Sequence, residues 1–192
     1  MIFIWREQGR LSELAPVVEP MLHDAVHPGA KRMLAIFASN RGDRPGVVEL
    51  LGADPVPRAL EFTWLCDACV AAELASDAQL SCASELFELL SPYADRVAAM
   101  DGTGICLGSV SYYLGLLASC IGRGDAIALH ERGMEMNDRI GAAVWSVRSR
   151  SALAQALSMS NPARATILLD EAAVRAAEHG LAAMQQKIAA IR

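Results

Sequence analysis

Apolar residues recur along most of the chain at spacings of three and four, which place side chains on one face of an α-helix. Leu11, Leu14 and Val18 show this spacing in one segment, and Leu86 and Leu90 show it in another. Helices are expected at 2–8, 11–26, 31–40, 47–51, 60–75, 77–90, 105–121, 125–140, 142–157, 163–179 and 181–191. We therefore predict about ten to eleven helices and no strand.

Short turns separate these helices at intervals of 33 to 45 residues, and they are led by Gly9, Gly42, Asp77, Gly122 and Asn161. Near the end of the chain, residues 126–149 realign on residues 165–188 at an offset of 39 residues, so that Gly141 falls on Gly180. A helix–turn–helix unit repeated at this length is typical of α-helical repeat proteins, in which each unit packs on its neighbours.

The predicted fold is all-α, a tetratricopeptide-like solenoid of helical hairpins in a single domain, with sub-units expected at 1–57, 58–104 and 105–192. The stretch 91–104 is expected to be an irregular connection, which explains the longest interval between turns. Both ends are predicted to be half-repeats, which lack a partner helix. Either these apolar ends meet another copy or a partner, or the chain corresponds to part of a longer ancestral protein.

Composition supports packed helices and excludes two kinds of partner. Hydrophobic residues make up 53% of the chain, which argues against disorder. Asp and Glu outnumber Lys and Arg by 22 to 17, so no nucleic-acid partner is expected, because phosphates require a basic surface. The apolar start, residues 1–5, is too short for a signal peptide, and no run reaches the roughly 18 apolar residues of a membrane span. Five cysteines without an export signal predict reduced thiols and a cytoplasmic protein.

Several short blocks resemble a recurrent region of actinobacterial signalling proteins: LFELLSPYADR at 86–96, CLGSV at 106–110, YLGLLA at 113–118, REQGRLSELA at 6–15 and GAAVW at 141–145. The chain resembles the tetratricopeptide-like C-terminal region of large regulators that combine an AAA-type ATPase with a LuxR-type DNA-binding domain or an adenylate-cyclase-like domain. No phosphate-binding loop of the form G-x-x-x-x-G-K-[ST] occurs, and nothing resembles a cyclase core or a DNA-binding helix-turn-helix. The resemblance therefore implies only the helical sensor or scaffold part, standing alone.

Two residue pairs have the spacing of metal ligands. Cys66 and Cys69 lack a second pair and lie among alanines of a predicted helix, where cysteine acts as a small apolar residue. His23 and His27 lack the glutamate base and third ligand of zinc hydrolases. We predict no metal and no cofactor. The glycine-rich stretch 102–108 is interpreted as a hinge at a helix start and not as a nucleotide loop, because no strand is expected before it.

Catalytic groups are not apparent either, because the serines have no histidine at an informative spacing, and the chain is predicted not to be an enzyme. The best candidates for ligand or peptide contacts are Tyr112, Tyr113, Trp145, Arg148 and Arg150. They belong to the first helices of two consecutive hairpins, which line the concave groove of tetratricopeptide-like stacks, and arginine beside an aromatic ring is a common anchor for carboxylates or peptides. The alternative is that Tyr113 and Trp145 pack between repeats while the arginines stay in solvent.

These patterns predict a non-enzymatic protein-interaction or sensor/scaffold module of bacterial signalling or transcriptional regulation, with a protein or peptide partner in the groove. A homodimer through the incomplete ends stays open. The alternative is a small-molecule sensor that holds a metabolite between Tyr112, Tyr113 and Arg148 in a pocket of a few hundred cubic ångströms. A gene remnant that folds and does little is the third hypothesis.

Overall fold

The structure is a computed structural model that describes residues 2–24, 28–51, 56–57, 63–100 and 104–192. Its helices are α1 (Ile2–Glu7), α2 (Leu11–His23), α3 (Pro28–Asn40), α4 (Arg44–Leu51), α5 (Trp64–Ala78), α6 (Ala83–Leu90), α7 (Val110–Cys120), α8 (Ala126–Arg139), α9 (Ala143–Leu157), α10 (Pro162–Glu178) and α11 (Ala182–Ile191). Between α6 and α7 lie a 3-10 turn, η1 (Ser91–Tyr93), and two strands, β1 (Val97–Met100) and β2 (Ile105–Ser109). The prediction of a mainly helical chain is confirmed. None of the described helices is both long and apolar enough to cross a membrane.

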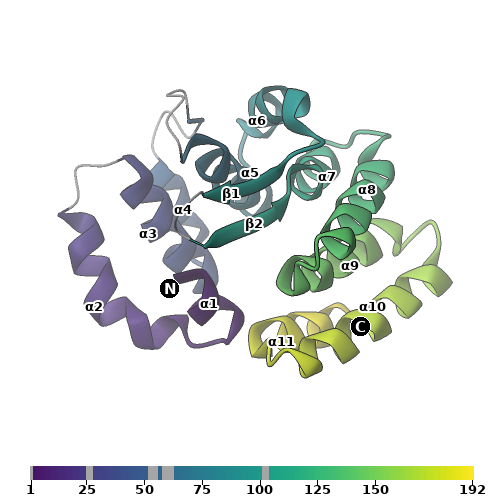
Figure 1. Ribbon diagram of the computed structural model, residues 1–192. Helices are drawn as coiled ribbons and strands as arrows, with labels where there is room; N and C mark the ends of the chain where they lie inside the picture. The colour runs from purple at the N-terminus through teal and green to yellow at the C-terminus, as the bar shows by residue number, and fades with distance from the viewer. Residues whose placement is uncertain (1, 25–27, 52–55, 58–62, 101–103) are drawn as a thin grey trace.

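The helices pack as consecutive pairs that curve into an arc. Helix α3 packs on α4, α5 on α6, α7 on α8, and α9 on α10. In addition, α5 contacts both α3 and α7, and α9 contacts both α7 and α11, so the odd-numbered helices form one layer. Figure 1 shows the chain curving from α2 past α5 and α7 to α9, with α1 lying next to α11.

The two predicted half-repeats cover each other. Helix α1 contacts α11, and the backbone at Gly9 lies against Ala183 at the start of α11. The first and last helices of the described chain therefore bury surface on one another, and the arc is closed on itself.

The prediction that the chain contains no strand is wrong. Strands β1 and β2 pair antiparallel, with Met100 opposite Ile105, and the helix expected from residue 105 begins only at Val110. Gly108 has a φ of +76°, a left-handed conformation that interrupts a helix, and Ser109 then caps α7 by accepting a hydrogen bond from the Ser111 amide. Strands of four and five residues give too short an alternation to stand out beside strong helical periodicity. Residues 102 and 103 of the predicted hinge lie outside the described residues.

One predicted turn also lies further along the chain. Helix α5 does not stop at Asp77 but continues to Ala78, and it ends at Gln79, which has a φ of +51°. Helices commonly end on a residue in this left-handed conformation, and that residue is usually glycine or asparagine. Because glutamine occupies the position here, the end of α5 could not be recognised from the sequence. Asp77 therefore occupies the last turn of α5.

Buried apolar side chains form two clusters that meet at α9. The larger one includes Phe37 of α3, Leu86 of α6 and Tyr113 of α7. The second one includes Leu153 of α9 and Ile188 of α11. Each pair of helices thus buries its apolar face on the next pair, while the three sub-units expected from the sequence stay a prediction.

Substitution of Gly108 tests how closely the β1–β2 hairpin packs against Trp145 of α9. A β-carbon there would lie 2.6 Å from Trp145 Cγ and 2.8 Å from Asn137 Oδ1, on a backbone that already favours glycine. We predict that Gly108→Ala lowers the free energy of unfolding by at least about 2 kcal/mol, measured by urea denaturation, because overpacking costs about 1–3 kcal/mol and backbone strain adds to it. Gly124→Ala is the control, because a β-carbon at Gly124 meets no atom within 4 Å. Equal stability of the two variants would contradict the close approach of Trp145.

Candidate functional site

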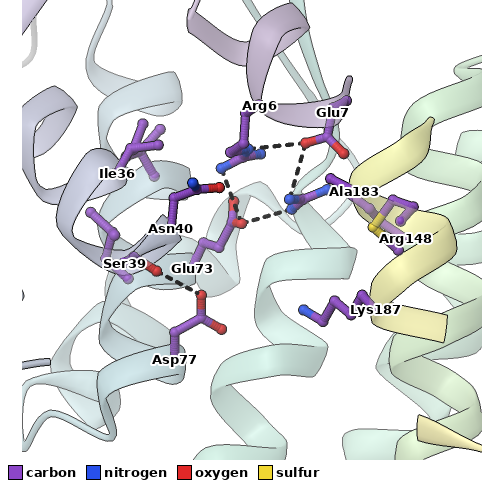
Figure 2. Close-up of a pocket in the computed structure, with 13 residues that line it drawn as sticks. Arg6, Glu7, Ile36, Ser39, Asn40, Glu73, Asp77, Arg148, Ala183 and Lys187 are labelled. Atoms are coloured by element: carbon purple, nitrogen blue, oxygen red, sulfur yellow. Dashed lines mark hydrogen bonds and ion pairs between the residues drawn. The ribbon is translucent and has the colours of Figure 1, made fainter. Parts of the chain in front are cut away.

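Four charged side chains form a closed ring of ion pairs, here called the ion ring, that joins α1, α5 and α9 (Figure 2). Arg148 donates to Glu73 Oε1 at 2.7 Å and lies 3.1 Å from Glu7 Oε1. Arg6 contacts the same two oxygens, at 3.2 Å for Glu73 and 3.0 Å for Glu7. All four side chains are between 5% and 12% exposed. Because two cations balance two anions, the ring buries no net charge.

Burial and pairing act on the ion ring in opposite directions. Burial alone would raise the pKa of Glu73, but Arg148 and Arg6 outweigh it and bring that pKa to about 2. Burial would lower the pKa of Arg148, but Glu73 and Glu7 hold it well above its usual range. Glu73 and Arg148 therefore stay charged at neutral pH. Removing one member would leave an uncompensated buried charge, which costs about 3–5 kcal/mol.

Beside the ion ring, three adjoining cavities of about 210, 440 and 310 Å³ form a space that we call the hollow. Its polar lining includes Ser39, Asp77, Tyr112, Ser119, Gln155 and Lys187. Asp77 and Lys187 border all three cavities, which makes these two residues the centre of the hollow. Figure 2 shows the first cavity between α3, α5, α9 and α11.

Helical spacing decides which residues face the hollow. On α5, Glu73 and Asp77 are four residues apart, and on α9 Arg148, Ser151 and Gln155 follow at intervals of three and four. Such positions lie on one face of a helix. One face of each odd-numbered helix from α3 to α11 contributes to the hollow.

Two of the predicted contact residues, Tyr113 and Trp145, lie in the core. The Tyr113 hydroxyl donates to the Leu107 carbonyl at 2.7 Å, and the Trp145 indole donates to the Cys106 carbonyl at 2.8 Å. The two aromatic rings pack with centroids 5.8 Å apart. They fix β2 against α7 and α9, as the packing interpretation predicts. Trp145 also borders a separate cavity of about 240 Å³ that lies outside the hollow.

Arg150, also a predicted contact residue, has carboxylate partners within the fold. Its guanidinium donates to both carboxylate oxygens of Asp138, at 2.8 and 2.7 Å, and to Glu171 at 3.0 Å. These bonds join α8, α9 and α10. Since Arg148 belongs to the ion ring, the alternative in which both arginines stay in solvent is wrong.

Tyr112 and Arg148 are the predicted contact residues that the structure brings together at the hollow, where both line the cavity of about 440 Å³. Burial raises the pKa of the Tyr112 hydroxyl, which therefore stays protonated. Arg148 already pairs with two carboxylates, so its charge serves the fold first. A binding role for these two residues stays a prediction.

Sequence reasoning missed Glu7, Glu73, Asp77 and Lys187. A signal for Glu73 was present, because it is a single carboxylate amid the apolar run VAAELA of α5, and a buried carboxylate requires a cationic partner. The identity of that partner was not readable, because Arg148 lies 75 residues away in the sequence.

The structure also pairs a serine and a histidine, since Ser119 Oγ lies 3.0 Å from His130 Nε2 at the edge of the hollow. His130 Nδ1 is buried and has no hydrogen-bond partner among the described residues, so none of their carboxylates orients the ring. Burial lowers the pKa of His130 to about 4, which makes it a weak base. Ser119 lies at the C-terminal end of α7, where backbone carbonyls and not amides are unpaired. The pair thus lacks the orienting group and the oxyanion donors of a nucleophilic site.

The cysteine pair lies inside α5. Burial raises the pKa of Cys66 to about 12 and that of Cys69 well above its usual value, whereas metal binding uses the thiolate. Within the described ranges, no group of three or more His, Cys, Asp or Glu residues could hold a metal ion. His27 lies outside those ranges, so the spacing from His23 is not tested.

Comparison of the chain with protein-family models, with curated proteins and with solved structures finds no match. The resemblance to the helical region of actinobacterial regulators therefore stays a prediction. What the chain does has to be inferred from the geometry of the hollow and the ion ring.

His130 makes the stability of the fold depend on pH. Its folded-state pKa is about 4, below the 6.5 of an exposed imidazole, so the unfolded chain takes up a proton first as the pH falls. This contribution to stability is complete above pH 6.5 and is lost between pH 6.5 and 4. At about 1.4 kcal/mol per pKa unit, the loss approaches about 3 kcal/mol. Urea denaturation at a series of pH values measures it.

His130→Leu is expected to remove this slope, whereas His179→Leu, at an exposed position of the α10 end, is expected to retain it. An unchanged slope between pH 6.5 and 5 in His130→Leu would contradict a buried neutral imidazole.

Proposed function

We propose that the chain is a non-enzymatic binding module, a tetratricopeptide-like helical repeat whose hollow holds a segment of a protein or peptide partner. The observation that supports it most is the hollow itself, lined by one face of successive odd-numbered helices. These are the first helices of the hairpins, and the curvature of a repeat stack makes their shared side a binding surface. A role in bacterial signalling or transcriptional regulation, in the cytoplasm, belongs to the same proposal and is motivated by the resemblance.

An extended peptide suits the shape and chemistry of the hollow. The three cavities meet at Asp77 and Lys187, and their lining extends to Ser39 in the first and third cavities and to Gln155 in the second. Hydroxyl and amide side chains can both donate to and accept from a peptide backbone. A peptide can therefore satisfy several separated polar groups at once.

A small-molecule sensor is the second candidate, and it is favoured by the cavity of about 440 Å³ beside Tyr112 and Arg148. This volume falls in the range of roughly 300–1,000 Å³ that small-molecule sites occupy. Ser151 lines that cavity, and its hydroxyl is buried without a hydrogen-bond partner in the described part of the chain, so a ligand could complete its hydrogen bonding. A homodimer stays a separate prediction, because the ends expected to form it pack on each other.

Peptide selection tests the main proposal. A displayed library of random peptides would be selected on the immobilised full chain, and the affinity of the selected peptides would be measured by fluorescence anisotropy. Gln155→Trp places an indole in the hollow from an exposed position of α9. We predict that it weakens binding at least about tenfold, because filling the site removes contacts worth more than about 1.4 kcal/mol.

Gln186→Trp is the matched control, since Gln186 is exposed on α11 and borders none of the three cavities. It should bind the selected peptides like the unmodified chain. Peptides that bind both variants equally well, or a selection that yields no peptide, would count against a peptide-binding hollow.

A further inference from the structure

Asp77 and Lys187 are opposite charges that the fold does not pair with each other. Asp77 accepts a long hydrogen bond from Ser39 Oγ, at 3.4 Å, and Lys187 makes no ion pair within the described part of the chain. Both residues are exposed to the hollow and border all three of its cavities. Figure 2 shows Lys187 extending from α11 into the space that Asp77 borders from α5.

The other charges that line the first cavity cancel, and Arg44 borders only the third cavity. Arg6 and Arg148 are matched by Glu7 and Glu73 in the ion ring, at distances of 2.7 to 3.2 Å. A ligand in the first cavity therefore meets one cation and one anion outside the ion ring, Lys187 and Asp77, which attract each other without forming an ion pair. Although Asp77 is exposed to the hollow, the surrounding walls desolvate its carboxyl, and this burial together with the neighbouring Glu73 raises its pKa more than Lys187, Arg148 and Arg6 lower it. A cation placed against the carboxylate would therefore stabilise its charge.

Two opposite charges on facing walls select for a ligand that carries both signs. A ligand with only a carboxylate is attracted by Lys187 and repelled by Asp77. A ligand with only an ammonium group is attracted by Asp77 and repelled by Lys187. Discrimination of this kind comes from repulsion as much as from attraction. A cavity of about 210 Å³ lies below the size of drug-binding pockets and matches one or two amino-acid units.

We propose that the hollow binds a short zwitterionic peptide group, with its carboxylate on Lys187 and its ammonium on Asp77. This proposal rests on the peptide-binding function above and names the chemistry of its ligand. The two charges come either from the free ends of a short peptide or from neighbouring side chains within a longer one. Asn40, beside them in the first cavity, supplies an amide for the peptide bond between the charges.

Calorimetric titration of the full chain with four probes tests the proposal. Glycylglycine carries both charges at its ends, and a lysyl-glutamate dipeptide blocked at both ends carries both on its side chains. N-acetylglycine has only the carboxylate, and glycinamide has only the ammonium. At least one of the two doubly charged probes is expected to bind at least about tenfold more tightly than either singly charged one, because each lost charged hydrogen bond costs that much or more.

Which doubly charged probe binds identifies the source of the charges. Tighter binding of glycylglycine assigns the site to peptide ends, and tighter binding of the blocked dipeptide assigns it to side chains. Equal binding of all four probes, or binding of none, would overturn the proposal.

Substitution of Asp77 and of Lys187 tests whether the probes bind at these two charges. Asp77→Asn and Lys187→Gln are expected each to weaken the better probe about tenfold, and both positions are exposed, so the fold should tolerate them. Asp170→Asn, an exposed carboxylate on α10 away from the hollow, is the control and should retain full affinity. A probe affinity that neither Asp77→Asn nor Lys187→Gln changes would overturn the proposal.

The selected peptides separate this proposal from the one on which it rests. Peptides that lose affinity in Gln155→Trp but not in Asp77→Asn or Lys187→Gln would preserve a peptide-binding hollow and overturn its zwitterion preference. Peptides that are indifferent to all three substitutions would count against both.

Discussion

A ring of four buried charges decides the shape of this chain. Helix α1 has only six residues, too few to be stable by itself, yet it supplies both Arg6 and Glu7 to the ring. Their partners, Glu73 and Arg148, come from helices far along the sequence. Since each member touches two others, the ring ties the first helix to the middle of the arc and brings it beside α11.

Closure of the arc creates the hollow and leaves charged side chains on its walls that a ligand could contact. The ion ring satisfies its own charges, and Arg150 is satisfied by Asp138 and Glu171 on the other side of α9. Arg6, Arg148 and Arg150 are therefore paired within the fold, whereas Asp77 and Lys187 form no ion pair within the described residues and are the charges that we propose for a ligand. For this reason the proposed ligand contacts, Asp77 and Lys187, differ from the aromatic residues and arginines that the sequence pattern indicated.

The helices could be predicted from sequence because their causes are local. Asn161, directly before the helix-starting Pro162, caps α10 by accepting a hydrogen bond from the Arg164 amide, and all three residues lie within a stretch of four. The strand at Gly108 depends on Trp145, which approaches from a distant helix, so its cause is not local. The ion ring was missed for the same reason, since apolar spacing predicts which helices pack but not which buried charges meet.

The most direct test of the ion ring is native-state hydrogen exchange of the α1 and α8 amides in Arg148→Met, compared with Arg164→Met, which removes an exposed ion pair with Glu131. Loss of Arg148 leaves two buried carboxylates that share one cation, Arg6, so one negative charge in the ring is uncompensated, at a cost of about 3–5 kcal/mol. The account predicts that α1 exchanges at least about a hundredfold faster in Arg148→Met, that α8 changes less, and that Arg164→Met leaves α1 unaffected. Unchanged protection of α1 in Arg148→Met would show that the ring does not hold the arc closed.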